Sequence, residues 1–159
     1  KAGGQLMGDL TIGLLADKGL GKLKNLKVFT LGGTTIKSTS ISFSQTSVNG
    51  YRRAVNDLKS GVYEPIDIVK MQDGLYTTVD NTRLRAAQDL GMDINAATHS
   101  FDDVIPEDVA KRFENPKQAG QYAKTWGEAV EFRTNSQNAA FRESYGGTGT
   151  FVQPKINSE

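Results

Sequence analysis

The sequence PIDIVKMQDGLYTTVDNTRLRAAQDLGMDINA (residues 65–96) decides the fold. Residues 65–71 predict a strand in which Ile66, Ile68 and Val69 are apolar. Asp73-Gly74 is a strong hairpin turn signal, and residues 75–79 predict the return strand. Residues 80–82 then cap a helix that begins near Arg83 and ends at Gly91. A third strand over residues 94–98 is expected to deliver His99 at its end.

The chain on either side of this stretch adds short strands and helices. Residues 26–36 predict strand, turn and strand around Gly32-Gly33, and residues 41–43 predict a further short strand. Apolar residues recurring at helical spacing from Tyr51 predict a helix over residues 49–60. Residues 107–113 predict a short helix, residues 117–145 one broken helix or two, and residues 146–159 an extended tail. We therefore expect an α+β domain in which helices surround a small mixed or antiparallel sheet with a central hairpin.

Composition excludes several kinds of chemistry. The 159 residues carry 19 basic and 18 acidic side chains, so any nucleic acid must meet a local basic cluster rather than a global positive field. Cysteine is absent, which excludes thiolate nucleophiles and Cys-based zinc sites. His99 is the only histidine, which excludes His-rich metal sites. No stretch of the sequence is apolar for long enough to span a membrane, so no stable membrane anchoring is expected.

Residues 1–27 differ in character from the rest of the chain. They hold many glycines, and Gly8 and Gly13 weaken a faint helical pattern. We interpret them as a linker or as the end of an upstream translocation region, and residues 28–159 as the functional domain. The sequence begins at Lys1 without a signal-peptide pattern, from which we expect a fragment of a longer protein.

The hairpin runs into a pattern of the form D-x-x-R…AA…G. Its residues are Asp80, Asn81, Thr82, Arg83, Arg85, Ala86, Ala87 and Gly91. This pattern resembles the ParB and sulfiredoxin-like family. The resemblance implies an arginine at a helix N-terminus, where backbone N–H groups and the helix dipole favour phosphate.

A wider set of motifs extends from residue 41 to residue 142. It comprises ISFSQ (41–45), VDNTR (79–83), His99 in a loop, KTWGEAV (124–130) and QNAAFR (137–142). As a set, these motifs resemble the C-terminal toxin domains of CdiA-type contact-dependent growth inhibition and other polymorphic toxin proteins. The resemblance implies a secreted or cell-surface effector that acts in the cytoplasm of a neighbouring bacterium and has a cognate immunity protein. Several toxins of this class cut tRNA, so tRNA is the expected substrate, and a target-cell activating factor is a further partner to consider.

A metal-independent ribonuclease needs a base for the ribose 2′-OH, an acid for the leaving oxygen and a cation for the phosphorane. Histidine titrates near neutral pH without tuning, so His99 is the first candidate for the acid or base. Arg83 and Arg85 can clamp phosphate with their planar forks, and Asp80 can orient His99 or act as a base itself. With a single histidine, the second acid–base partner must be Asp80, Glu128, Lys70 or a bound water.

The predicted site therefore has two sets of residues and needs no metal or other cofactor. The predicted catalytic residues are His99, Asp80, Arg83 and Thr82. The predicted substrate-binding residues are Arg85, Asn81, Ser44, Gln45, Lys70, Glu128, Arg133 and Gln137. Structural roles compete with these assignments: residues 80–82 as a helix N-cap, the arginines as a solvated helix face, and Trp126 as core.

Three alternatives stay open beside a ribonuclease. A metal-dependent DNase needs a carboxylate cluster, for which the sequence offers Asp102, Asp103, Glu107 and Asp108. A ParB-like toxin would bind or hydrolyse a nucleotide, although the chain has no P-loop and no cysteine for sulfiredoxin chemistry. A non-catalytic nucleic-acid-binding or protein-interaction module is the third, and a ParB-like reader would normally carry a helix-turn-helix, which the sequence does not reveal.

Overall fold

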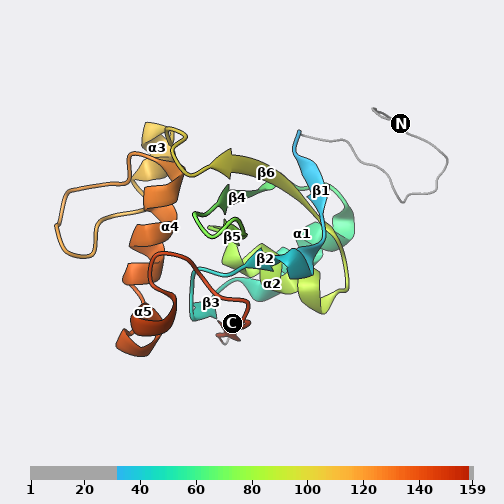
Figure 1. Ribbon diagram of the computed structural model, residues 1–159. Coiled ribbons are helices and arrows are strands. Elements are labelled where there is room, and N and C mark those ends of the chain that lie inside the picture. Colours follow the sequence, from blue (N-terminus) through green and yellow to red (C-terminus); the bar gives the residue numbers. More distant parts are fainter. Residues whose placement is uncertain (1–31, 158–159) are drawn as a thin grey trace.

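The computed structural model describes residues 32–157, which form an α+β architecture (Figure 1). Residues 1–27, interpreted above as a linker or translocation region, lie outside the described residues, as does the first part of the strand pair expected over residues 26–36. Among the helices that the structure describes, none is long and apolar enough to cross a membrane.

A mixed sheet of five strands forms the centre, in the order β1-β6-β4-β5-β2. β6 pairs in parallel with β4, and β2 in parallel with β5, whereas β1–β6 and the hairpin β4–β5 are antiparallel. The expected sheet with a hairpin at its centre is therefore confirmed. A separate parallel pair, β3–β7, joins the loop after β2 to the C-terminal segment. The strands are β1 (Thr34–Ile36), β2 (Ile41–Ser42), β3 (Ser47–Val48), β4 (Ile66–Lys70), β5 (Tyr76–Thr78), β6 (Ile94–Ser100) and β7 (Lys155–Ile156).

Helices lie on both sides of this sheet (Figure 1). Gly61 ends the helix α1 (Tyr51–Ser60) in the left-handed conformation that glycine adopts without strain. Thr125 is the N-cap residue of α4, and its side chain accepts a hydrogen bond from the Glu128 backbone. The described helices are η1 (Ser38–Ser40), α1 (Tyr51–Ser60), α2 (Asn81–Asp89), α3 (Glu107–Ala110), α4 (Trp126–Asn135) and α5 (Ala139–Tyr145).

Strand β4 divides the core into two clusters, because alternate side chains of a strand point to opposite faces of the sheet. Ile66 and Ile68 pack in one cluster with Leu84 of α2 and apolar residues of α1. Val69 packs in the other with Trp126 and further residues of α4. Helices α1 and α2 therefore cover one face of the sheet, and α4 covers the other.

One predicted boundary is wrong in a way that matters for the site. The third strand was expected to end at residue 98, but β6 continues to Ser100, so His99 lies within a strand and not in a loop. The physical reason is the parallel ladder with β4, which continues to the pair Lys70↔Ser100. His99 is therefore held by backbone pairing with a buried neighbouring strand.

The remaining differences concern helix ends. The helix expected to begin near Arg83 begins at Asn81, and Asp80 makes no side-chain capping hydrogen bond. The helix expected over residues 107–113 ends at Ala110. Residues 117–145 contain two helices, α4 and α5, separated by a break at residues 136–138.

Replacing Gly127 by Ala tests the packing of α4 against the segment after β6. Ala is favoured over Gly inside a helix by about 1 kcal/mol, but a Cβ at this position would lie 2.5 Å from ring carbons of Phe101. Overpacking costs roughly 1–3 kcal/mol, so we expect Gly127→Ala to lower the free energy of unfolding in urea denaturation. In a Phe101→Ala background the same change should be stabilising. A Gly127→Ala variant more stable than wild type would contradict this packing.

Candidate active site

His99 and Asp67 meet on the sheet face that α4 covers. In the parallel ladder Asp67 stands opposite Ala97 and Val69 stands opposite His99, so the two polar side chains share one face. The Nε2 atom of His99 lies 2.9 Å from Oδ1 of Asp67. The side chains are 21% and 31% exposed, respectively, so the pair is partly open to solvent and to a bound molecule.

Trp126, the first residue of α4, completes the surroundings of His99. Its ring stacks on the imidazole with centroids 3.9 Å apart and planes inclined by 11°. The indole is 5% exposed and packs with the α4 core cluster, which confirms the core role expected for it. The stack also restricts rotation of the imidazole, so His99 is held by a carboxylate at its edge and an indole at its face.

This arrangement leaves one nitrogen of His99 available. When Nε2 carries the proton donated to Asp67, Nδ1 has a lone pair, and it accepts no hydrogen bond from residues 32–157. A carboxylate on one nitrogen fixes the tautomer and stabilises the imidazolium that forms when the other nitrogen takes a proton. The pair can therefore act first as a general base and then as a general acid.

The carboxylate that contacts His99 is Asp67, whereas the sequence suggested Asp80 for that orienting role. The carboxylate of Asp80 instead forms an ion pair with Arg83. Sequence analysis missed Asp67, although an acidic residue between two isoleucines of a central strand is an unusual signal. Its partner could not be read from the sequence, because the contact depends on the register between β4 and β6.

Both arginines that were predicted to hold phosphate donate to acceptors within the fold. Arg83 donates to both carboxylate oxygens of its ion-pair partner and to the carbonyl oxygen of Glu64. Arg85 donates to Asp89 on the next turn of α2 and to the carbonyl oxygen of Pro154. A phosphate would have to compete with these acceptors, and the phosphate-binding role of both residues stays a prediction.

Three of the predicted substrate-binding residues form a polar network between the loop after β2 and the start of α2. The Ser44 backbone N–H donates to Asn81 Oδ1 at 2.7 Å, and Asn81 Nδ2 donates to Ser44 Oγ at 3.0 Å and to Gln45 Oε1 at 2.9 Å. The Ser44 hydroxyl donates to the Thr78 carbonyl at 2.7 Å. Ser44 and Asn81 are 0% and 2% exposed, so they join two segments of the fold and do not face a ligand.

The loop after β2 is also linked to the end of α4. The backbone N–H and the hydroxyl of Thr46 donate to Gln137 Oε1 at 3.0 and 3.2 Å. Gln137 Nε2 donates in turn to the carbonyl of Arg133 at 3.0 Å. The structure thus links the following predicted residues into one neighbourhood: Ser44, Gln45, Asn81, Gln137 and Arg133.

Three other predicted residues lie in separate places. The Thr82 hydroxyl donates to the carbonyl of Asn49 at 2.9 Å. Lys70 is exposed and, three positions after Asp67 on β4, points to the opposite face of the sheet. Glu128 accepts from the backbone of Lys124 at 2.8 Å and, with the N-cap threonine of α4, forms an arrangement close to a capping box.

Two groups on α4 have shifted pKa values. Burial raises the pKa of Glu131, and the charge of Glu128 raises it further. Burial, together with the nearby charge of Arg112, lowers the pKa of Arg133 to about 10, and Asp80 acts in the opposite direction. Glu131 therefore keeps its proton to a higher pH than an ordinary glutamate does. Sequence analysis singled out Glu128 instead, because burial of Glu131 is a tertiary effect.

Candidate metal ligands do not gather in the described residues. No group of three or more His, Asp or Glu side chains within residues 32–157 could hold a metal ion. The four acidic residues considered for a DNase belong to the segment from the end of β6 to α3, where Asp103 accepts a hydrogen bond from the Ser100 backbone. These carboxylates therefore form no ligand cluster of that size.

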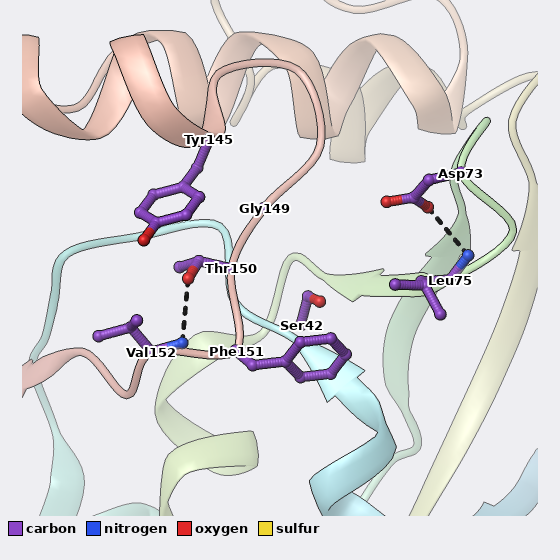
Figure 2. A pocket seen from close by; sticks show the side chains of 8 residues that line it. All are labelled: Ser42, Asp73, Leu75, Tyr145, Gly149, Thr150, Phe151 and Val152. Carbon is purple, nitrogen blue, oxygen red and sulfur yellow. Dashed lines mark hydrogen bonds between the residues drawn. The ribbon is translucent and has the colours of Figure 1, made fainter.

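An open groove of about 520 Å³ lies along β2, the β4–β5 turn and the C-terminal segment (Figure 2). Two side chains in the groove accept local hydrogen bonds: Asp73 accepts from the Leu75 backbone and Thr150 from the Val152 backbone. It contains none of the predicted catalytic residues, so we place the candidate site at His99 instead. The groove is lined by Ser42, Asp73, Leu75, Tyr145, Gly149, Thr150, Phe151 and Val152.

No protein-family model, curated protein or solved structure matches this chain. The toxin resemblance and the ParB/sulfiredoxin-like resemblance therefore stay predictions from motifs. What the site can do is argued from its own geometry.

Replacing Asn81 by Ala separates a structural role from a substrate-binding one. The change leaves the buried Ser44 backbone N–H without an acceptor, and an unsatisfied buried donor costs roughly 1–3 kcal/mol. We expect Asn81→Ala to lower the free energy of unfolding by about that amount in urea denaturation, whereas Asn56→Ala on the exposed face of α1 should change it by less than about 0.5 kcal/mol. Equal stability of the two variants would show that the buried network contributes little.

Proposed function

We propose that the chain cleaves RNA by metal-independent acid–base catalysis centred on His99. The observation that carries the proposal is the geometry of that side chain, with Asp67 2.9 Å from Nε2 and Trp126 stacked on the ring. A charged partner, a fixed ring and partial exposure are what a histidine needs to transfer protons to and from a substrate.

RNA fits this chemistry better than DNA because only RNA carries its own nucleophile. In the proposed reaction His99 Nδ1 takes the proton of the ribose 2′-OH, and the 2′ oxygen attacks phosphorus. The bond from phosphorus to the 5′ oxygen breaks, and the leaving oxygen takes a proton from an acid. The histidine imidazolium, stabilised by Asp67, can supply that proton. The step needs no water, metal or cofactor.

The biological setting of the proposal comes from the sequence motifs alone. Their resemblance to CdiA-type toxin domains supports a secreted antibacterial toxin that acts on tRNA in the cytoplasm of a neighbouring cell. The same resemblance supports a cognate immunity protein, and an activating factor in the target cell is compatible with it. An immunity protein with an acidic surface would complement arginines of this chain.

Replacing His99 by Ala should abolish cleavage. General acid–base catalysis contributes roughly 10²- to 10⁴-fold, and the chain has no second histidine. The measurement is a denaturing gel of bacterial tRNA incubated with the chain in EDTA. The matched control is Thr98→Ala, one position earlier on β6 and on the opposite face of the sheet, which should cleave like wild type.

The same gel, together with a plasmid-nicking assay and a phosphate-release assay, separates the alternatives. Cleavage by His99→Ala at the wild-type rate would eliminate His99 as the catalytic group. RNA that stays intact in EDTA, in magnesium and in cell extract, while plasmid DNA is nicked in magnesium, would replace the ribonuclease by a metal-dependent DNase. Release of inorganic phosphate from nucleoside triphosphate, with RNA and DNA both intact, would favour the ParB-like alternative.

Replacing Asp67 by Asn tests the orienting carboxylate. The amide can still hydrogen-bond the ring, but it removes the charge that stabilises the imidazolium and permits the wrong tautomer. We expect kcat to fall by a factor on the order of 10² or more, with KM changed by less than about twofold. Asp57→Asn, which removes an exposed carboxylate on α1, is the control for the change in charge. An unchanged kcat, or a rise in KM alone, would contradict the orienting role.

A further inference from the structure

Two arginines share one buried phenyl ring at the end of α4. The guanidinium carbon of Arg133 lies 4.7 Å from the ring centroid of Phe113, and that of Arg112 lies 5.3 Å from it. The ring itself is 1% exposed, so its position is fixed by the core. Arg112 is exposed and Arg133 is half-buried, so both cations reach the surface around Phe113.

Neither of these guanidinium groups has an anionic partner among the described residues. Arg83 and Arg85 are in ion pairs, and Arg142 donates to the carbonyl of Gln137. Arg112 and Arg133, by contrast, make no side-chain hydrogen bond or ion pair within residues 32–157, and their guanidinium groups lie over the ring. No acceptor among the described residues therefore engages the N–H donors of either side chain, which can instead bind an anion.

The positive charges of the two arginines repel each other. Burial lowers the pKa of Arg133, and repulsion from Arg112 lowers it further. The carboxylate that acts in the opposite direction, Asp80, already neutralises Arg83. A bound anion would relieve this repulsion, and a planar guanidinium fork suits a phosphate in particular.

The position of the pair on α4 relates it to His99. Trp126, which stacks on His99, and Arg133 are seven positions apart in the sequence, so they lie on the same stripe of the helix and about 10 Å apart along its axis. Both side chains contact the same core cluster. A nucleotide strand that presents one phosphate to His99 can therefore present a neighbouring phosphate to the arginines.

We infer that Arg112 and Arg133 form a phosphate subsite that binds the backbone of a single-stranded polynucleotide beside the His99 site. This inference rests on the proposed function for the identity of the ligand. The two arginines would bind the sugar-phosphate backbone of the polynucleotide. The sequence motifs pointed to Arg133 without a partner and did not point to Arg112.

Binding of a fluorescein-labelled single-stranded oligoribonucleotide tests the subsite separately from cleavage. Anisotropy titrations over a range of salt concentrations use His99→Ala chains, which leave the probe intact. We expect Arg112→Gln to weaken binding at least threefold and the double change Arg112→Gln, Arg133→Gln at least tenfold. The slope of log affinity against log salt should fall by about 0.7 for each phosphate that the variant no longer binds. Arg53→Gln on α1 is the charge-matched control and should change neither quantity beyond a general charge effect.

Thermal unfolding of each variant checks that it is folded. Arg133→Lys is a second control, because it keeps the positive charge and removes the planar guanidinium fork. Binding that equals the Arg53→Gln control in both affinity and salt slope overturns the inference, whether or not the wild-type chain cleaves RNA. Probe binding that depends on the pair, in a chain that cleaves nothing, retains the subsite and rejects the ribonuclease. Binding of inorganic phosphate that depends on the pair, without any effect on the oligonucleotide, makes it a site for a small anion and overturns the strand subsite.

Discussion

The alternation of side chains along β4 is the constraint on which the rest of the structure depends. Ile66 and Ile68 pack against α1 and α2, while Asp67 and Val69 face α4. A slip of one residue would exchange these faces, burying the carboxylate among isoleucines and removing it from His99. Because β4 is the middle strand, the same register determines both cores and the candidate site.

Local signals in the sequence were enough for most of the fold. The Asp73-Gly74 turn, the apolar periodicity from Tyr51 and the glycines after two helices predicted the hairpin, α1 and the helix ends correctly. Boundaries that depend on distant pairing were less predictable. The extension of β6 to Ser100 comes from its ladder with β4, a strand about thirty positions earlier in the chain, which no local pattern encodes.

The candidate site was less predictable than the fold. The single histidine had to be the first candidate, but its carboxylate partner depends on register and its indole partner on the docking of α4. The motif around Arg83 marked it as a phosphate ligand, yet the carbonyl of Glu64 already occupies one of its donors. Whether an arginine is hydrogen-bonded within the fold depends on backbone atoms that lie far away in the sequence. The sequence therefore did not mark Arg112 as a residue that could bind a ligand.

The stack of Trp126 on His99 gives the molecule a built-in optical reporter. The chain has one tryptophan and one histidine, and their rings lie 3.9 Å apart. Protonated imidazole quenches indole emission on contact, so the fluorescence of the unmodified chain follows the protonation and displacement of a single side chain. With no second indole to add background, proton uptake and ligand arrival at His99 can be watched in real time without any label.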